Sequence, residues 1–246
     1  MFSELNEEGS LMIDLEKKND IFILTLTGEE NRWHTEFVRV IAQAVDEIEA
    51  SQGAAALVTT ASSRKFFSNG LDLDWLKTAE EQDRAAFLPE FMALMGRLIT
   101  LPVPSVCAIN GHAFGAGFMM ALCHDVRLMR EDRGFACANE IEIGMVIPDP
   151  ELALFKHKLP ANVFFETVQL ARRWTGKDAA DVGIASAAYP LSYLMSKAIQ
   201  KAESLKHLGA NRKVYQTMKE RLFGQTAPIN NVHGAAHLLK NGIMTS

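Results

Sequence analysis

The first two thirds of the chain alternate short apolar runs with longer stretches in which apolar residues recur at helical spacing. The short runs predict buried strands and the periodic stretches predict helices with one buried face. These segments follow one another at residues 11–17, 21–27, 35–52, 54–60, 80–99, 105–110 and 125–129. The first two surround Lys18, Asn19 and Asp20, which predicts a hairpin, and Thr35 is a plausible first helix cap. Strands alternating with helices indicate an α/β fold.

Beyond Pro148-Asp149-Pro150 the pattern is helical only, which predicts a different kind of carboxy-terminal region. The expected helices cover residues 151–158, 161–173, 177–183, 191–208, 211–223 and 230–240. We therefore expect an α/β core over residues 1–190 and a helical subdomain over residues 191–246. Apolar residues recur along the first part of that subdomain, and their spacing fits either a core or a subunit contact: Leu191, Leu194, Met195, Ala198 and Ala202.

Composition excludes several classes of function. The chain has 246 residues, and 25 Lys plus Arg against 30 Asp plus Glu give a net charge of −5, which argues against nucleic acid as a partner. Its longest apolar run, at residues 113–123, is well short of the roughly 20 residues that span a membrane. Three cysteines without a C-x-x-C pair, and an acidic amino terminus without a signal pattern, favour a cytoplasmic protein.

Two glycine turns each follow a predicted strand, FFSNGLD at residues 66–72 and GHAFGAG at residues 111–117. A turn that opens a helix exposes backbone N–H groups without helical acceptors, so two such turns could hold an oxyanion. The glycines could equally serve tight packing between strand and helix. Both interpretations stay open from the turns alone.

Other common ligand motifs are missing from the sequence. Gly115-Ala116-Gly117 is followed by Phe118-Met119-Met120 and so does not complete a dinucleotide fingerprint. Neither a Walker loop nor a G-x-S-x-G elbow occurs, and the seven histidines lack zinc-type spacing. We therefore expect no metal and no separate cofactor.

Residues 133–144, RGFACANEIEIG, place Glu140 and Glu142 in an otherwise apolar stretch. A carboxylate held among apolar side chains resists ionisation, and its raised pKa suits a base acting on a weak carbon acid. The alternative is one buried capping carboxylate and one solvated carboxylate.

Together and in order, these segments resemble the crotonase family, the enoyl-CoA hydratase/isomerase superfamily. FFSNGLDL is similar to its F-x-x-G-x-D-[LI] loop, and LPVPSVCAINGHAFGAGFMMALCHDVRLM to its second glycine turn and the strand after it. NEIEIGMVIP is similar to the segment with the acid–base glutamate, and TGKDAADVGIASAAYP to the A-x-x-x-G-[LI]-V stretch. The resemblance covers roughly residues 11–190 and implies a ββα spiral core, with helices that form a homotrimer or hexamer.

The resemblance also implies the site. The N–H groups of Leu71 and Ala116 would hold the thioester oxygen of an acyl-CoA substrate, within a substrate-binding loop that includes Ser68, Asn69, Gly70 and Asp72. Glu140 would be the acid–base glutamate, a single proton shuttle that takes a proton from C2 of a 3-enoyl-CoA and returns it to C4. Arg64 and Lys65 could meet the coenzyme A phosphates or could form a solvated pair.

Met119 occupies the position of the second glutamate that water-adding members of the family use. One carboxylate suffices to move a double bond, so the resemblance is closest to Δ3,Δ2-enoyl-CoA isomerases, enzymes of fatty acid β-oxidation. An acyl pocket of apolar residues would exclude water, and we expect it to consist of Phe114, Phe118, Met119 and Ile147.

Three alternatives stay open: hydration, thioester hydrolysis or decarboxylation with help from Glu142 or Asp149, and acyl-CoA binding without catalysis. The final residues, Met244-Thr245-Ser246, are unlike a peroxisomal S-K-L signal, which agrees with the cytoplasmic expectation.

Overall fold

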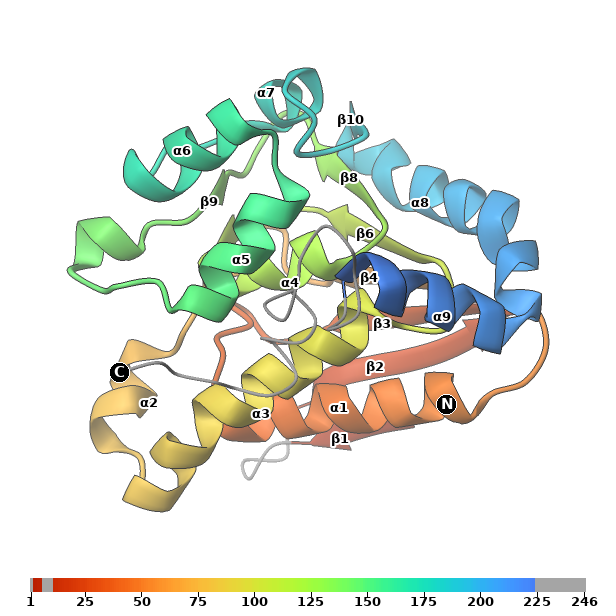
Figure 1. Ribbon diagram of the computed structural model, residues 1–246, viewed down its shortest axis with the longest axis horizontal. Coiled ribbons are helices and arrows are strands. Elements are labelled where there is room, and N and C mark those ends of the chain that lie inside the picture. Colours follow the sequence, from red (N-terminus) through yellow and green to blue (C-terminus); the bar gives the residue numbers. More distant parts are fainter. Residues whose placement is uncertain (1, 6–10, 224–246) are drawn as a thin grey trace.

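The computed structural model describes residues 2–5 and 11–223, and its main sheet has the strand order β1-β2-β3-β4-β6-β8-β10 (Figure 1). The strands are β1 (Phe2–Leu5), β2 (Leu11–Lys18), β3 (Ile21–Leu26), β4 (Ala56–Ala61), β6 (Ser105–Ile109), β8 (Val126–Arg130) and β10 (Ala187–Tyr189). β1, β2 and β3 pair antiparallel, and every pairing from β3 to β10 is parallel. The α/β class predicted from the alternating pattern is confirmed.

The predicted opening hairpin is present. Lys18 pairs with Ile21, so Asn19 and Asp20 alone form its turn, with φ of 49° and 66°. A two-residue hairpin turn of this kind needs positive φ at both positions, which Asn and Asp tolerate better than most residues. These two residues therefore set the register of the first strand pair.

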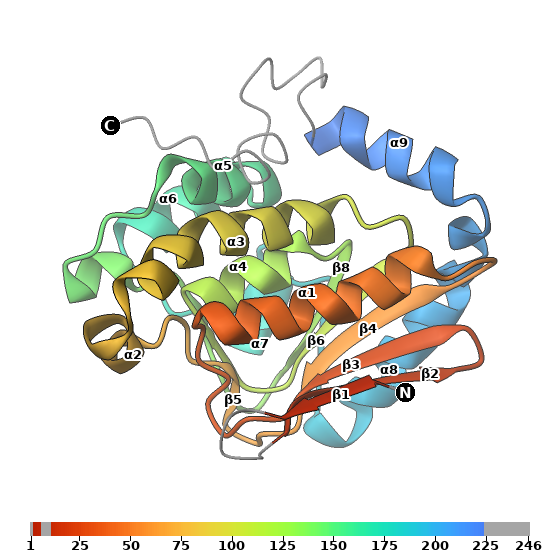
Figure 2. The same ribbon diagram turned by 90° about the horizontal axis from the view of Figure 1, so that it is seen from below.

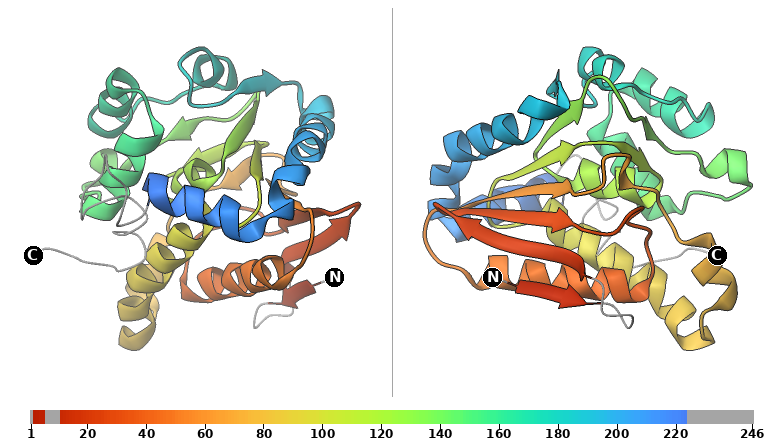
Figure 3. Two further views of the ribbon diagram at one scale, coloured as in Figure 1. Left: turned by 45° about the vertical axis from the view of Figure 1, so that its right-hand side comes forward. Right: turned by 180° about the vertical axis from the view of Figure 1, so that it is seen from behind.

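Helices cover both faces of the main sheet (Figures 2 and 3). The helices are α1 (Thr35–Ala50), α2 (Leu73–Thr78), α3 (Glu81–Ile99), α4 (Ala116–Cys123), α5 (Asp149–Lys158), α6 (Ala161–Gln169), α7 (Gly176–Asp181), α8 (Leu191–Leu205) and α9 (Arg212–Phe223), with 3-10 turns η1 (Glu140–Ile143) and η2 (Lys206–Ala210). On one face Phe22 and Leu24 of β3 join the core formed with α1, α3 and α4. On the other face Ile21 and Ile23 pack with α8, as the two-residue repeat of a strand requires.

Two sequence expectations change in detail. The cap of α1 is His34, whose Nδ1 accepts a hydrogen bond from the Phe37 N–H, and Thr35 is the first helical residue. Leu194, Ala198 and Ala202 of α8 are buried against the sheet, so the first helix after residue 190 contributes to the core of this chain.

The helix expected at residues 230–240 lies outside the described residues. In the described part of the chain, no helix combines the length and apolarity needed to cross a bilayer.

A second, smaller sheet carries the glycine turns. It contains β5 (Phe66–Ser68), β7 (His112–Phe114) and β9 (Ala136–Cys137), all parallel and in that order. Sequence analysis missed these strands because runs of two or three residues are too short to show a period. Because the carboxyl ends of parallel strands meet at one edge of a sheet, the segments that follow the three strands lie together.

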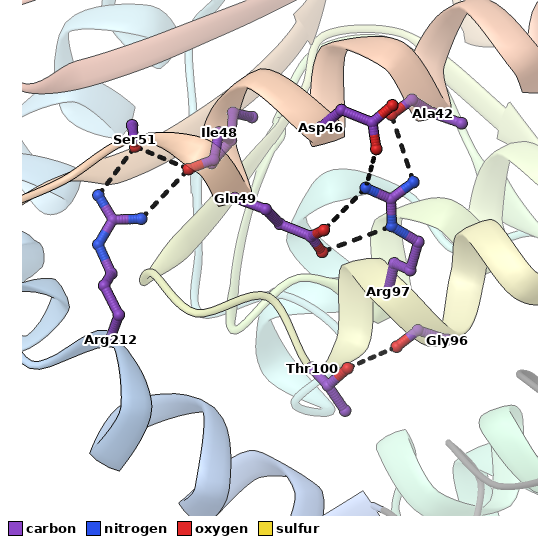
Figure 4. A network of polar contacts seen from close by, with 9 residues as sticks. All are labelled: Ala42, Asp46, Ile48, Glu49, Ser51, Gly96, Arg97, Thr100 and Arg212. Carbon is purple, nitrogen blue, oxygen red and sulfur yellow. Dashed lines mark hydrogen bonds and ion pairs between the residues drawn. The ribbon is translucent and has the colours of Figure 1, made fainter.

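Arginine side chains tie helices together on one side of the molecule (Figure 4). Arg97 of α3 donates to Asp46 at 2.6 Å and to Glu49 at 2.8 Å, both on α1. Arg212 of α9 donates to the Ile48 carbonyl at 3.2 Å and to Ser51 Oγ at 2.9 Å, at the carboxyl end of α1. α1 is thus held from two neighbouring helices.

The Arg97→Met variant keeps an unbranched apolar stem and removes the guanidinium that joins α1 to α3. Because the Arg97 side chain is only 26% exposed, we expect the free energy of unfolding to fall by about 1–2 kcal/mol, measured by urea unfolding. The matched control is Arg39→Met, which removes a half-exposed arginine joining the same two helices and should cost under about 1 kcal/mol. Equal losses in the two variants would contradict the role given to Arg97.

Candidate active site

The two glycine turns are in direct contact where β5 and β7 end. A Cβ built on Gly117 would lie 2.5 Å from Ser68 Cβ, and one built on Gly70 would lie 3.0 Å from the Phe114 carbonyl oxygen. Neither position has room for a side chain without movement of its neighbours. The glycines are therefore needed for the close approach of the two turns, and the packing and binding interpretations of the sequence are compatible.

Ser68 fixes the conformation of the first turn. Its buried hydroxyl accepts a hydrogen bond from Trp33 Nε1–H at 3.0 Å and donates one to the Asn31 carbonyl at 2.7 Å. The Gly70 N–H also donates to this hydroxyl, at 3.3 Å. Ser68 thus supports the turn from behind and does not line the cavity described below.

The backbone N–H of Leu71 points away from the neighbouring segment that contains Trp33. Leu71 forms a parallel bridge with Trp33, in which the Trp33 N–H donates to the Gly70 carbonyl and the Asp72 N–H donates to the Trp33 carbonyl. Since successive N–H groups of an extended chain point to opposite sides, the Leu71 N–H points away from Trp33. Among the described residues it has no acceptor.

The Ala116 N–H is the second such donor. Ala116 is the first residue of α4, so its N–H has no acceptor within the helix, and none occurs elsewhere in the described chain. Gly115 before it has φ of 47° and ψ of −118°, a conformation that glycine adopts readily. A Cβ on Gly115 would lie 3.0 Å from Glu140 Oε1, so the Glu140 carboxylate packs against this turn.

Glu140 begins η1 just after β9, and its side chain is buried with no counterion in the part of the chain that the structure describes. The residue is 9% exposed, and its Oε2 atom has no hydrogen-bond partner among the described residues. Burial raises the pKa of Glu140 above its ordinary value. An ionised carboxylate in such surroundings is a stronger base than one in water, which suits proton removal from carbon.

These groups share one cavity of about 430 Å³. Asn69, Gly70 and Leu71 line it from the first turn, Gly115 and Ala116 from the second, and Glu140 from η1. Apolar side chains of α3 complete much of the wall: Phe87, Leu88 and Phe91. The arrangement combines two N–H donors and a buried base in a largely apolar space, which is suited to stabilising a carbanion conjugated to a carbonyl group.

The structure brings only part of the expected acyl pocket to this cavity. Met119 lines it, whereas Phe118 packs in the core with its ring 5.6 Å from that of Phe155. Phe114 stacks on His112, and Ile147 lines a separate depression beside α6. The expected substrate contact Asp72 instead caps α2, where its carboxylate accepts from the Asp74 and Trp75 N–H groups.

Sequence analysis missed three charged residues that line the cavity, and Glu151 is the most consequential. It lies in the first turn of α5, is 8% exposed, and adds a second carboxyl group to a site expected to hold one. Arg32 and Arg84 also line the cavity, whereas Arg64 and Lys65 do not. No pattern in the sequence singled out Glu151, because an acidic residue in a first helical turn is common.

Two further carboxylates that were alternatives for catalysis lie outside the cavity. Glu142 is exposed and pairs with Arg173 at 2.7 Å, and Asp149 is exposed at the start of α5. Over residues 2–5 and 11–223, no cluster of three His, Cys, Asp or Glu side chains is arranged to hold a metal ion.

Comparisons of the sequence and of the structure with known proteins all point to enoyl-CoA hydratases and isomerases. The family model described as "Enoyl-CoA hydratase/isomerase" matches residues 16–237. Peroxisomal enoyl-CoA delta isomerase 2 of Arabidopsis thaliana is 32% identical over 227 residues, covering 89% of this chain and 95% of the relative. Enoyl-CoA delta isomerase 3 of the same plant is 32% identical over 219 residues, covering 86% and 92%. The structure of a probable enoyl-CoA hydratase, EchA3, from Mycobacterium tuberculosis superposes with a TM-score of 0.79 at 24% identity, covering 94% of this chain and 92% of the other.

Proposed function

The chain belongs to the enoyl-CoA hydratase/isomerase family and has its crotonase-type fold, and from that premise we propose that it shifts the double bond of a 3-enoyl-CoA to give 2-trans-enoyl-CoA. The observation that carries the proposal is the position of the Glu140 carboxylate. It is buried, has no counterion within residues 2–5 and 11–223, and packs against the turn that presents the Ala116 N–H.

In the proposed reaction, Glu140 removes a proton from C2 of the bound thioester. The C2–H electron pair moves into the conjugated system, and the negative charge collects on the thioester oxygen between the Leu71 and Ala116 N–H groups. A proton then returns at C4, and the electron pair moves back to leave the double bond between C2 and C3. Neither water nor a separate cofactor takes part, and coenzyme A enters only as part of the substrate.

Isomerisation is favoured over hydration by the apolar wall of the cavity. Met119 stands where water-adding members resembling this chain carry a glutamate, and its side chain cannot orient a water molecule. The Arabidopsis relatives named above are enoyl-CoA delta isomerases, which supports the same choice.

The direct test is a spectrophotometric assay with 3-hexenoyl-CoA and, in parallel, 2-hexenoyl-CoA. We expect 3-hexenoyl-CoA to be converted to the conjugated 2-enoyl thioester, and 2-hexenoyl-CoA to gain water much more slowly. Faster water addition would identify a hydratase. Binding without turnover for every chain length of 3-enoyl thioester would identify a non-catalytic acyl-CoA-binding protein.

The pH dependence should report the buried base. Only ionised Glu140 can accept the C2 proton, and burial raises its pKa above 4.5, so kcat/KM should increase with pH through a value above 4.5. Other ionisable groups facing the cavity are Glu151, Arg32 and Arg84. A pH profile of initial rates, with stability measured at each pH, checks this. An acidic limb at or below pH 4.5 would contradict a buried base.

The remaining expectations are also proposals. An exposed apolar surface around η1 and α6 supports assembly into a homotrimer or hexamer, and it includes Ile141, Ile143, Val146, Phe165 and Leu170. Val146 is the most exposed of them, at 88%. A cytoplasmic location and a role in fatty acid β-oxidation stay predictions from the sequence.

A further inference from the structure

Glu151 is a buried carboxyl group that the proposed reaction does not use. It lines the same cavity as Glu140 but comes from a different element, α5. It is 8% exposed, so its carboxyl group is largely withdrawn from bulk water inside the cavity. Burying a carboxyl group costs free energy, so its presence in a ligand-sized cavity points to a role toward whatever binds there.

The pKa values of the two carboxyl groups are raised by different causes. Burial, reinforced by the negative charge of Glu140, raises the pKa of Glu151 to about 8. Burial alone raises the pKa of Glu140, and a hydrogen bond with its own backbone lowers that pKa in part. Near neutral pH Glu151 is therefore largely protonated and can act as an acid, as in sites where two carboxyl groups divide the proton transfers.

Glu140 and Glu151 also belong to different elements of the cavity wall, η1 and α5. Glu140 packs against Gly115, beside the Ala116 N–H, and so lies near the carbonyl end of a thioester held there. Glu151 belongs to α5, which packs on α4, and Met119 lines the cavity one helical turn beyond Ala116. A thioester held by the Leu71 and Ala116 N–H groups would extend its acyl chain into the cavity that Glu151 also lines.

We infer that Glu151 is a second catalytic residue, which protonates C4 of the dienolate after Glu140 has removed the proton from C2. The inference rests on the proposed isomerase function. In the first step the C2–H bond breaks and an O–H bond forms on Glu140. In the second the Glu151 O–H bond breaks and the C4–H bond forms, leaving Glu140 protonated and Glu151 ionised. Glu140 then loses its proton to solvent and Glu151 regains one from solvent, which restores the starting state.

Isotope transfer separates this mechanism from a single-carboxyl shuttle. With 3-hexenoyl-CoA carrying two deuterium atoms at C2, a shuttle on Glu140 alone carries deuterium to C4. With Glu151 as the donor, C4 receives hydrogen that Glu151 took from solvent. We expect the wild-type product to carry mostly solvent hydrogen at C4, measured by NMR or mass spectrometry under initial-rate conditions in ordinary water.

The variant Glu151→Gln preserves the shape of the side chain and cannot donate a proton as an acid. We expect kcat to fall by about tenfold or more, and the remaining product to contain more deuterium at C4 because Glu140 must then serve both carbons. The matched control is Glu142→Gln, a surface glutamate outside the cavity, which should leave rate and label unchanged.

Two results would overturn the assignment of Glu151. One is a Glu151→Gln enzyme with wild-type rate and label distribution. The other, which needs no variant, is wild-type product that retains nearly all the transferred deuterium at C4. A wild-type protein with no activity on 3-enoyl thioesters would instead refute the isomerase proposal itself, so the two failures are distinguishable.

Discussion

Replacing Glu140 by glutamine is expected to lower kcat for isomerisation of 3-hexenoyl-CoA by roughly 10²–10⁴-fold, the usual contribution of a general base. Glutamine keeps the shape of the side chain against Gly115 but cannot accept a proton from carbon. The backbone donors of Leu71 and Ala116 are unchanged, so the affinity for the thioester should change little. Initial rates and equilibrium binding of the same substrate provide the two measurements.

The stability of the Glu140→Gln variant shows whether the loss is chemical. The pKa of Glu140 is raised in the folded protein, so the stability it contributes is present below the ordinary value of 4.5 and is lost as pH rises through the folded pKa. At pH 7 the glutamine variant should therefore be at least as stable as the wild type. Retention of more than about a tenth of wild-type kcat would remove Glu140 from the mechanism.

The Gly117→Ala variant is expected to impair both stability and activity. The new Cβ would lie 2.5 Å from Ser68 Cβ and 2.9 Å from the Ser68 carbonyl oxygen, which belongs to the backbone and cannot rotate away. The turn that carries Leu71 would have to move away from the start of α4. We expect the free energy of unfolding to fall by about 1–3 kcal/mol. kcat/KM should fall by about tenfold or more, because displacement of the N–H donors weakens charge stabilisation.

The matched control for this variant is Gly53→Ala. Gly53 has φ of 80° but no atom near its missing Cβ, so the substitution introduces backbone strain without a steric clash. We expect it to cost about 1 kcal/mol of stability and to leave kcat/KM unchanged. If the Gly117→Ala variant is less stable but keeps full activity, the close packing of the two turns does not determine the spacing of the Leu71 and Ala116 N–H groups.

The parts of this molecule that could be predicted from sequence are those with a local signal. Alternating apolar runs predicted the main sheet and its helices, and Asn19-Asp20 predicted the hairpin turn. The glycine turns, through their resemblance to a known family, led to Leu71, Ala116 and Glu140, which the structure gathers around one cavity. Their catalytic roles stay predictions.

What could not be predicted depends on packing between distant segments. Every residue of α4 is buried, so its sequence has no polar face to show which side meets the cavity, and Phe118 and Met119 were equally plausible there. The structure points Met119 into the cavity and Phe118 toward Phe155. Glu151 follows Glu140 by eleven residues, and only the packing of α5 on α4 brings both to one space.

The small sheet of β5, β7 and β9 has far fewer ladder hydrogen bonds than the main sheet, although Phe67, Ala113 and Ala136 pack in the same core. Its strands have two or three residues each. Small units of this kind can open while a larger sheet stays folded. Amide hydrogens of this sheet should therefore exchange faster than those of β4 and β6. Mild denaturant or heat would then abolish turnover before the protein unfolds. The temperature at which activity is lost would therefore lie below the melting temperature of the whole protein.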